Sequence, residues 1–155
     1  MDVAARAAAP GDLEVITALC ESGMAELRPN RGGEIWSQWE ARPEPVGPAL
    51  AALVDDEAAL LLAGQIDGTT VGYAAVTLHE LHDARIVGHL TDLYVMPDAR
   101  GVGIGEAMMH AVNDWCGAQG CVGVDSIALP GDRATKNFFE TFGMVARALR
   151  VHRAL

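Results

Sequence analysis

Apolar residues recur along this chain with two different periods, which separate strands from helices. Apolar positions every three or four residues predict two long amphipathic helices, at 13–27 after an N-cap at Asp12, and at 104–116. Continuous or alternating apolar runs predict strands at 3–8, 58–66, 70–78, 85–96, 121–129 and 145–152. Together with the shorter helices described next, this order predicts a mixed α/β sandwich.

Turn-forming residues define how these segments connect. Asp67-Gly68, between two apolar runs, is a strong signal for a two-residue hairpin, so the flanking strands should be antiparallel. Further along, a helix is predicted over 132–142, with Asp132 as its N-cap and Gly143 just after its end.

The segment 28–48 is the least regular part of the chain. It contains four prolines, together with Trp36 and Trp39 at the i, i+3 spacing of a helix. The pattern predicts a long excursion that holds one short helix, followed by a helical piece at 48–54.

Composition indicates a soluble globular protein with one domain, 1–155. Half of the 155 residues are hydrophobic and 21% are charged. No apolar run reaches the roughly 20 residues of a membrane span, and no basic, apolar leader begins the chain, so a cytoplasmic protein is expected. Eleven basic against 21 acidic residues give a net charge of −10, which disfavours nucleic acid and favours cationic ligands, although solubility explains it equally well.

The cysteines give no sign of a disulfide framework or a metal site. Cys20, Cys116 and Cys121 are an odd number, widely spaced, without a C-x-x-C pair or a zinc-type spacing with histidine. They are predicted to be reduced thiols in the core, and no metal is expected.

The segment 89–106, H-L-T-D-L-Y-V-M-P-D-A-R-G-V-G-I-G-E, carries the clearest functional signal. It is predicted to form a strand, a glycine-rich turn and the start of a helix. Glycines let backbone N–H groups converge, and a helix N-terminus adds unpaired N–H donors, so the pattern predicts a phosphate site. Glu106 breaks the dinucleotide fingerprint, and no G-K-[ST] follows for a P-loop. The alternative is a turn that serves only tight packing of strand against helix.

The pattern that remains is R-x-x-G-x-G at Arg100, Gly103 and Gly105, after a strand that ends in V-x-P. It resembles the Gcn5-related N-acetyltransferases (GNAT), in which such a turn holds the pyrophosphate of acetyl-CoA. The stretch 132–144, D-R-A-T-K-N-F-F-E-T-F-G-M, resembles a second element of that family. The resemblance implies an α+β fold with a mixed, mostly antiparallel central sheet flanked by helices. The strand and turn are most similar to those of diamine (spermidine/spermine) N-acetyltransferases.

The resemblance also implies which residues would bind acetyl-CoA as co-substrate. Backbone groups where the strand splays from its neighbour, at Leu93, Tyr94 and Val95, would hold the thioester carbonyl and the pantetheine. N–H groups of the turn would hold the pyrophosphate, with Arg100 beside them, at Gly101, Val102, Gly103, Ile104, Gly105 and Glu106. Asp132 replaces an asparagine that touches the cofactor in relatives, and its alternative role is only to cap its helix.

The two positions at which the resembled enzymes carry their catalytic base and acid hold other residues in this chain. Thr91 stands where the diamine enzymes carry a catalytic glutamate, and Phe139 where the family carries the tyrosine that serves the leaving thiolate. The substitutes are His89 as a base, Tyr94 as the acid, and Asp92, which is expected on the opposite sheet face from Thr91 and could also bind a cationic substrate. Each has an ordinary structural alternative, and transfer by positioning and a water relay also stays open.

The acceptor is predicted to be the primary amine of a small, cationic molecule that attacks acetyl-CoA directly. Glu34, Trp36 and Trp39, with Glu40 nearby, lie where the resemblance places the acceptor pocket; the tryptophans could form an aromatic wall for an ammonium group or belong to the core. The missing glutamate and tyrosine favour an alternative, a non-catalytic acyl-CoA-binding sensor or subunit. A Rossmann-type NAD binder is a third, disfavoured alternative, and a homodimer through the edge strand 145–152 is expected.

Overall fold

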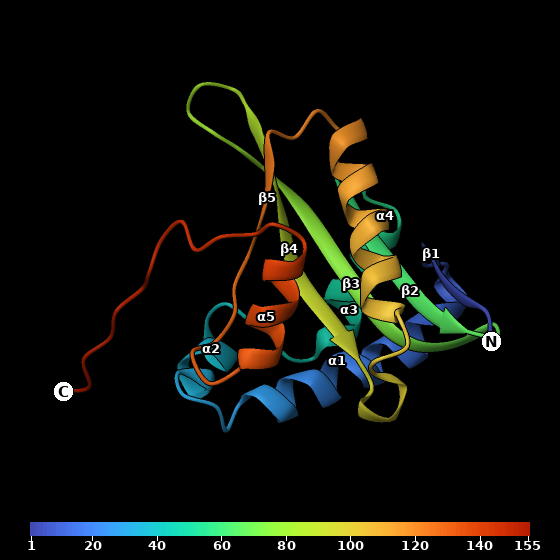
Figure 1. Cartoon of the computed structure of the whole chain (residues 1–155), viewed down its shortest axis with the longest axis horizontal. Coiled ribbons are helices and arrows are strands. Elements are labelled where there is room, and N and C mark those ends of the chain that lie inside the picture. The colour runs from blue at the N-terminus through green and yellow to red at the C-terminus, as the bar shows by residue number, and fades with distance from the viewer.

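The computed structural model describes residues 1–155, which form one five-stranded sheet with helices on both faces (Figure 1). The strands are β1 (Val3–Ala7), β2 (Ala59–Ile66), β3 (Thr69–Glu80), β4 (Ile86–Val95) and β5 (Gly123–Ser126). The helices are α1 (Leu13–Leu27), α2 (Gly33–Gln38), α3 (Val46–Val54), α4 (Ile104–Ala118) and α5 (Arg133–Thr141), with 3-10 turns at Pro10–Asp12 and Pro97–Ala99. None of the helices has the length and apolarity that a membrane span requires.

The strands lie in chain order, β1-β2-β3-β4-β5. The first three pairings are antiparallel and β4 pairs with β5 in parallel through the crossover helix α4. Asp67 and Gly68 both have positive φ, 48° and 80°, as a tight hairpin turn between β2 and β3 requires. The predicted hairpin and the mixed, mostly antiparallel sheet are therefore confirmed.

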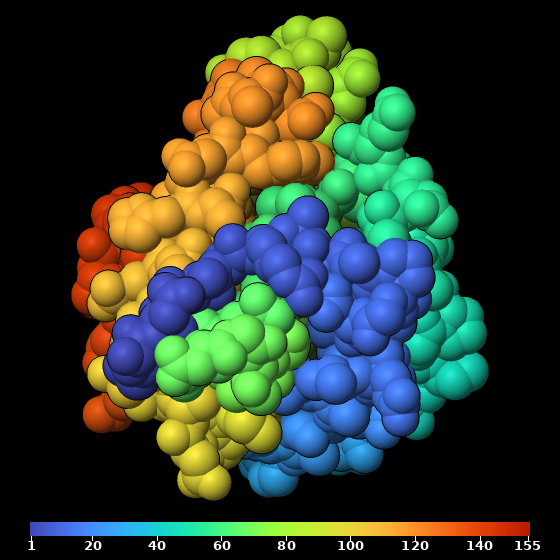
Figure 2. Space-filling model, turned by 90° about the vertical axis from the view of Figure 1, so that its right-hand side faces the viewer, coloured from blue at the N-terminus to red at the C-terminus, as the bar shows by residue number.

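Helices cover the two faces of the sheet, and each face has its own hydrophobic core. α1 and α3 pack on one face and α4 with α5 on the other; Figure 2 looks onto the β1 edge with these layers on either side. The predicted apolar stripes of both long helices are buried, Ile16, Leu19, Cys20 and Met24 in α1, and Ile104, Met108, Val112 and Cys116 in α4. Gly64 lets α4 approach, since a Cβ there would lie 2.8 Å from Cγ2 of Ile104.

A β-bulge interrupts β4 at Thr91. Ala75 of β3 pairs with Asp92 and Val76 with Leu90, so Thr91 has no partner across the ladder. The extra residue turns the Thr91 side chain toward that of Asp92, and its Oγ1 donates to Asp92 Oδ1 at 2.6 Å. The expectation that these two side chains lie on opposite faces is wrong, because it assumed strict alternation along the strand.

The predicted strand 145–152 is not formed. After Met144, whose N–H donates to the carbonyl of Phe139, no backbone hydrogen bond ties the chain down, and every residue of the segment 145–155 is exposed. An alternating sequence becomes a strand only when it pairs with an edge, and the neighbouring β5 is four residues long. The edge expected for a homodimer is thus missing, and the oligomeric state stays a prediction.

Candidate active site

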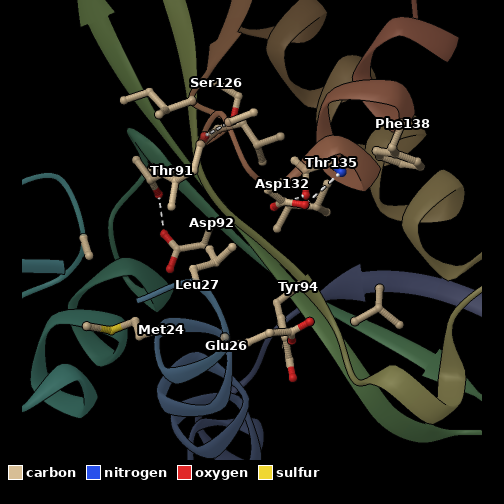
Figure 3. A pocket seen from close by; sticks show the side chains of 18 of the residues that line it. Met24, Glu26, Leu27, Thr91, Asp92, Tyr94, Ser126, Asp132, Thr135 and Phe138 are labelled. Atoms are coloured by element: carbon tan, nitrogen blue, oxygen red, sulfur yellow. Dashed lines mark hydrogen bonds between the residues drawn. The ribbon is translucent and has the colours of Figure 1, made fainter. Parts of the chain in front are cut away.

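A cleft opens where β4 and β5 part. Their pairing ends at Leu90 and Ser126, where Ser126 Oγ donates to the Leu90 carbonyl at 2.8 Å. Beyond that point the stretch 93–95 pairs with β3 alone, so its other edge faces the cleft. The cleft has a volume of about 960 Å³ and lies between α1 and α2 on one side and α5 on the other (Figure 3).

The glycine-rich turn forms a row of free backbone donors at one end of this cleft. Gly101 and Gly103 adopt left-handed φ values of 80° and 99°, which glycine accepts without strain. None of the six consecutive N–H groups from Gly101 to Glu106 donates to a backbone carbonyl, and α4 begins within this stretch at Ile104. Free N–H groups at the positive end of a helix fit a pyrophosphate.

Gly105 serves packing as well. A Cβ on Gly105 would lie 3.2 Å from Cζ of Phe138 in α5, whereas a Cβ on Gly101 or Gly103 would meet nothing within 4 Å. The turn therefore uses its three glycines, Gly101, Gly103 and Gly105, for two purposes. The first two shape the turn, and the third lets α5 sit against the first turn of α4.

Arg100 extends toward α1 and not along the turn. Its Nη1 and Nη2 donate to the carboxylate of Glu26 at 2.9 and 2.8 Å, and its Nε donates to the Val95 carbonyl at 2.8 Å. Hydrogen bonding to this guanidinium lowers the pKa of Glu26. The contact fastens the C-terminal end of β4 to α1, beside the ring of Tyr94.

Asp132 caps α5, as its sequence context predicts. Its carboxylate accepts from the N–H of Thr135 at 3.2 Å and from Thr135 Oγ1 at 2.6 Å (Figure 3). Asp132 also lines the cleft, whereas Val102 does not.

Asp92 lies at the centre of a hydrogen-bond network on the floor of the cleft. Its carboxylate accepts from Tyr73 Oη at 2.7 Å, from Thr91 Oγ1, and from Arg42 Nη2 and Nε at 2.8 and 3.2 Å. Burial raises the pKa of Tyr73, and the negative charge of Asp92 raises it further. Burial likewise raises the pKa of the adjacent Cys20 thiol to about 11. At neutral pH both groups therefore keep their protons.

The other two predicted catalytic residues also line the cleft. The Tyr94 ring packs against α1, within 3.1 Å of the place where a Cβ on Gly23 would be, and its pKa is raised, first by burial and then by Glu26. His89 pairs in register with Asp125 of β5. Phe139 is buried at the cleft wall and offers no hydroxyl.

The acceptor side of the cleft differs in part from the sequence prediction. Trp36 and Trp39 line it, but Glu34 is exposed and outside it, because α2 turns that side chain away. Two arginines that no sequence pattern selected line it as well. Arg42 comes from the proline-containing loop after α2, and Arg150 from the C-terminal segment.

Two solved structures share this fold over nearly the whole length of both chains. The chain superimposes on a tetramutant of the BH1408 protein from Bacillus halodurans with a TM-score of 0.83 and 19% identity, over 100% of both chains. It also superimposes on AAC(6')-Iy in complex with the bisubstrate analogue CoA-S-monomethyl-acetylneamine, with a TM-score of 0.73 and 18% identity, over 100% of this chain and 99% of that one. At these identities the similarity concerns the fold alone.

Sequence comparison adds a closer kind of similarity. An aminoglycoside N(6')-acetyltransferase type 1 from Stenotrophomonas maltophilia is 35% identical over 95 residues, which cover 56% of this chain and 62% of that protein. The match thus spans about three fifths of the relative's length. This relative is named as an aminoglycoside acetyltransferase, so the match does not support the predicted similarity to diamine acetyltransferases in particular. The model of the acetyltransferase (GNAT) family matches residues 22–144. The chain belongs to the GNAT acetyltransferase family.

Proposed function

We propose that this chain is an acetyl-CoA-dependent N-acetyltransferase that moves an acetyl group directly to a primary amine of an aminoglycoside. The observation that carries the proposal is the row of six free N–H groups beside the unpaired edge of β4, in one cleft. The acceptor class is supported by the name of the Stenotrophomonas maltophilia relative and by the acetylneamine analogue bound to AAC(6')-Iy.

The residues of the cleft fit acetyl-CoA. The N–H groups of the turn at 101–106 would hold the pyrophosphate, and the free edge at 93–95 would hold the pantetheine and the thioester carbonyl by backbone hydrogen bonds. The bound co-substrate would supply the activated acetyl group. Arg100 would support this arrangement through Glu26, which ties the end of β4 to α1.

Direct attack by the amine is favoured over an acyl-enzyme. Cys20 is the cysteine that lines the cleft, and with a pKa of about 11 its thiol is protonated at neutral pH. The attacking amine must itself be neutral, although an alkylammonium has a pKa of about 10.4. His89 is the proposed base, directly or through water, because the carboxylate of Asp92 is already occupied by three side chains.

Tyr94 is the proposed acid for the leaving thiolate. A phenol with a raised pKa stays protonated at neutral pH and can donate its proton. The absence of a hydroxyl at Phe139 leaves this role to another residue. Positioning of the amine against the thioester would provide much of the remaining acceleration.

The second candidate function is a non-catalytic acyl-CoA-binding subunit. Thr91 and Phe139, in place of the glutamate and tyrosine of the resembled enzymes, favour it. Both candidates predict binding of CoA compounds, and only the first predicts turnover.

Two measurements test these proposals in sequence. Thermal melting with acetyl-CoA, desulfo-CoA and NAD tests the cofactor site, since a ligand at 100 times its Kd adds about 2.7 kcal/mol of stability. Stabilisation by both CoA compounds but not by NAD is expected. Release of free CoA thiol in the presence of neamine then tests transfer. Binding without thiol release from neamine or any other amine in a panel would favour the second candidate, and stabilisation by NAD alone would overturn both.

A further inference from the structure

The C-terminal segment 145–155 contributes one residue, Arg150, to the acceptor side of the cleft. It leaves α5 as an extended chain (Figure 1) and is held by the side chains of two arginines. Arg147 Nε donates to both carboxylate oxygens of Asp125, at 2.9 and 2.8 Å. Three residues later, Arg150 enters the lining of the cleft.

The guanidinium of Arg150 lies between a carboxylate and an aromatic ring, two groups that bind cations. Its Nη1 lies 2.5 Å from Oε1 of Glu40, and its guanidinium carbon lies 5.1 Å from the centroid of the Trp39 ring. Glu40 comes from a sequence position 110 residues away, and its side chain is only 20% exposed. The second oxygen, Oε2, is buried and has no hydrogen-bond partner. A carboxylate with a free buried oxygen beside an aromatic face is suited to a charged nitrogen with several N–H donors.

We propose that Trp39 and Glu40 form a subsite for a non-reacting ammonium group of the acceptor, and that Arg150 of the same chain occupies this subsite when no acceptor is bound. The inference rests on the proposed function, because it specifies how the acceptor is held. It requires an acceptor with at least two amines. One of them reacts at the thioester, and the other replaces the guanidinium of Arg150.

The two amines of the acceptor need opposite protonation states, because the attacking amine must be neutral and the amine in the subsite must be charged. A carboxylate next to an ammonium group stabilises its charged form and raises its pKa. The attacking nitrogen must lose its proton, so contact with Glu40 would oppose its reaction. The same contact favours binding of an amine that stays charged, which makes Trp39 and Glu40 a site for affinity and specificity.

Arg150 is held weakly enough to be displaced. No backbone hydrogen bond anchors its segment, and the Arg150 side chain is 67% exposed. Exposed ion pairs contribute little because water and salt screen them. Arg150 also leaves Glu40 Oε2 unpaired, so an acceptor amine that reached this oxygen would gain a hydrogen bond that Arg150 does not make. The segment thus acts as an internal competitor for cationic acceptors.

The test is neamine binding to the chain 1–155 with desulfo-CoA present, measured by calorimetry so that no turnover is needed. Arg150→Gln should bind neamine about three to ten times more tightly, as the loss of one exposed ion pair and one cation–π contact would allow. Arg153→Gln is the matched control, since it removes the same charge from the same exposed segment and should bind as the unsubstituted chain does. Adding Glu40→Gln to Arg150→Gln should cancel the gain. A methyl glycoside with a single 6-amino group should bind all variants equally.

Several results would overturn the subsite. The first two are equal neamine affinity in Arg150→Gln and Arg153→Gln, and weaker neamine binding in Arg150→Gln than in the unsubstituted chain. The third is a gain in affinity that does not change when Glu40→Gln is added. The fourth is the absence of neamine binding in every variant that still binds desulfo-CoA. The thiol-release assay answers the separate question of transfer. A chain that binds neamine as described but releases no CoA thiol would contradict the proposed catalysis and leave the subsite intact.

Discussion

Arg42 and Asp92 form an ion pair across the floor of the cleft, with 2.8 Å between Nη2 and Oδ1 and side chains that are only 14% and 11% exposed. The pair joins the loop after α2 to the bulged part of β4, 50 residues further along the chain. Tyr73 and Thr91 donate to the same carboxylate, so each of its two oxygens accepts at least two hydrogen bonds. Asp92 therefore organises the cleft floor in this structure.

Arg42→Ala should destabilise the fold by about 3 kcal/mol, because it leaves a largely buried carboxylate without its counter-ion. Urea unfolding at pH 7 measures the loss. Arg85→Ala is the control, since the Arg85–Asp83 pair is exposed and its loss should cost no more than about 1 kcal/mol. Equal destabilisation by the two variants would contradict the structural role given to Arg42.

Gly103→Ala should weaken acetyl-CoA binding by about tenfold, which corresponds to about 1.4 kcal/mol. Gly103 has a φ of 99°, and an alanine there is strained and would redirect the free N–H groups of the turn. Melting curves over a series of acetyl-CoA concentrations give the Kd. Gly117→Ala, near the end of α4 and with open space at its Cβ, should leave the Kd unchanged and add about 0.5–1 kcal/mol of stability. An unchanged Kd for Gly103→Ala would contradict the proposal that the N–H groups of this turn bind acetyl-CoA.

Tyr94→Phe should lower kcat by about a hundredfold with little change in KM for acetyl-CoA, as expected for the loss of a general acid. Because burial raises the pKa of Tyr94, its proton is retained at high pH. The kcat of the unsubstituted chain should therefore show no alkaline decrease from Tyr94 below about pH 10. Adding Phe139→Tyr to Tyr94→Phe should restore part of the rate if leaving-group protonation is limiting. A Tyr94→Phe variant with full kcat would exclude this role.

Arg100→Gln and Glu26→Gln should each remove about 0.2–1 kcal/mol of stability at pH 7, since their pair is exposed. The folded-state pKa of Glu26 is lowered, so this stability is present above its unfolded pKa of about 4.3 and is lost as the pH falls through the folded value. Denaturant unfolding should therefore show a smaller difference from the unsubstituted chain at pH 3 than at pH 7.

The same two variants test how Arg100 supports acetyl-CoA binding. If Arg100 acts through its contact with Glu26, both substitutions should change the Kd by a similar factor. Weaker binding in Arg100→Gln together with equal or tighter binding in Glu26→Gln would show that Arg100 meets the pyrophosphate itself.

Local rules made much of the architecture predictable. The stripes of α1 and α4, the hairpin turn at Asp67 and the cap at Asp132 depend on residues within a few positions of each other, and all are present as expected. The free N–H groups of the turn follow in the same way, because glycine and a helix start are local features.

What the tertiary structure decided depends on contacts between distant residues. The bulge at Thr91 arises from pairing with β3, and it places Thr91 and Asp92 together where strict alternation would separate them. The segment 145–155 has the alternation of a strand but forms no backbone hydrogen bond with β5, the four-residue edge strand of the sheet. Arg42 reaches the cleft from an irregular loop and Arg150 from a segment that pairs with no strand, and their carboxylate partners lie 50 and 110 residues away. A sequence pattern specifies the backbone of a segment, whereas the identity of the side chains that meet in a cleft is fixed only when the whole chain has folded.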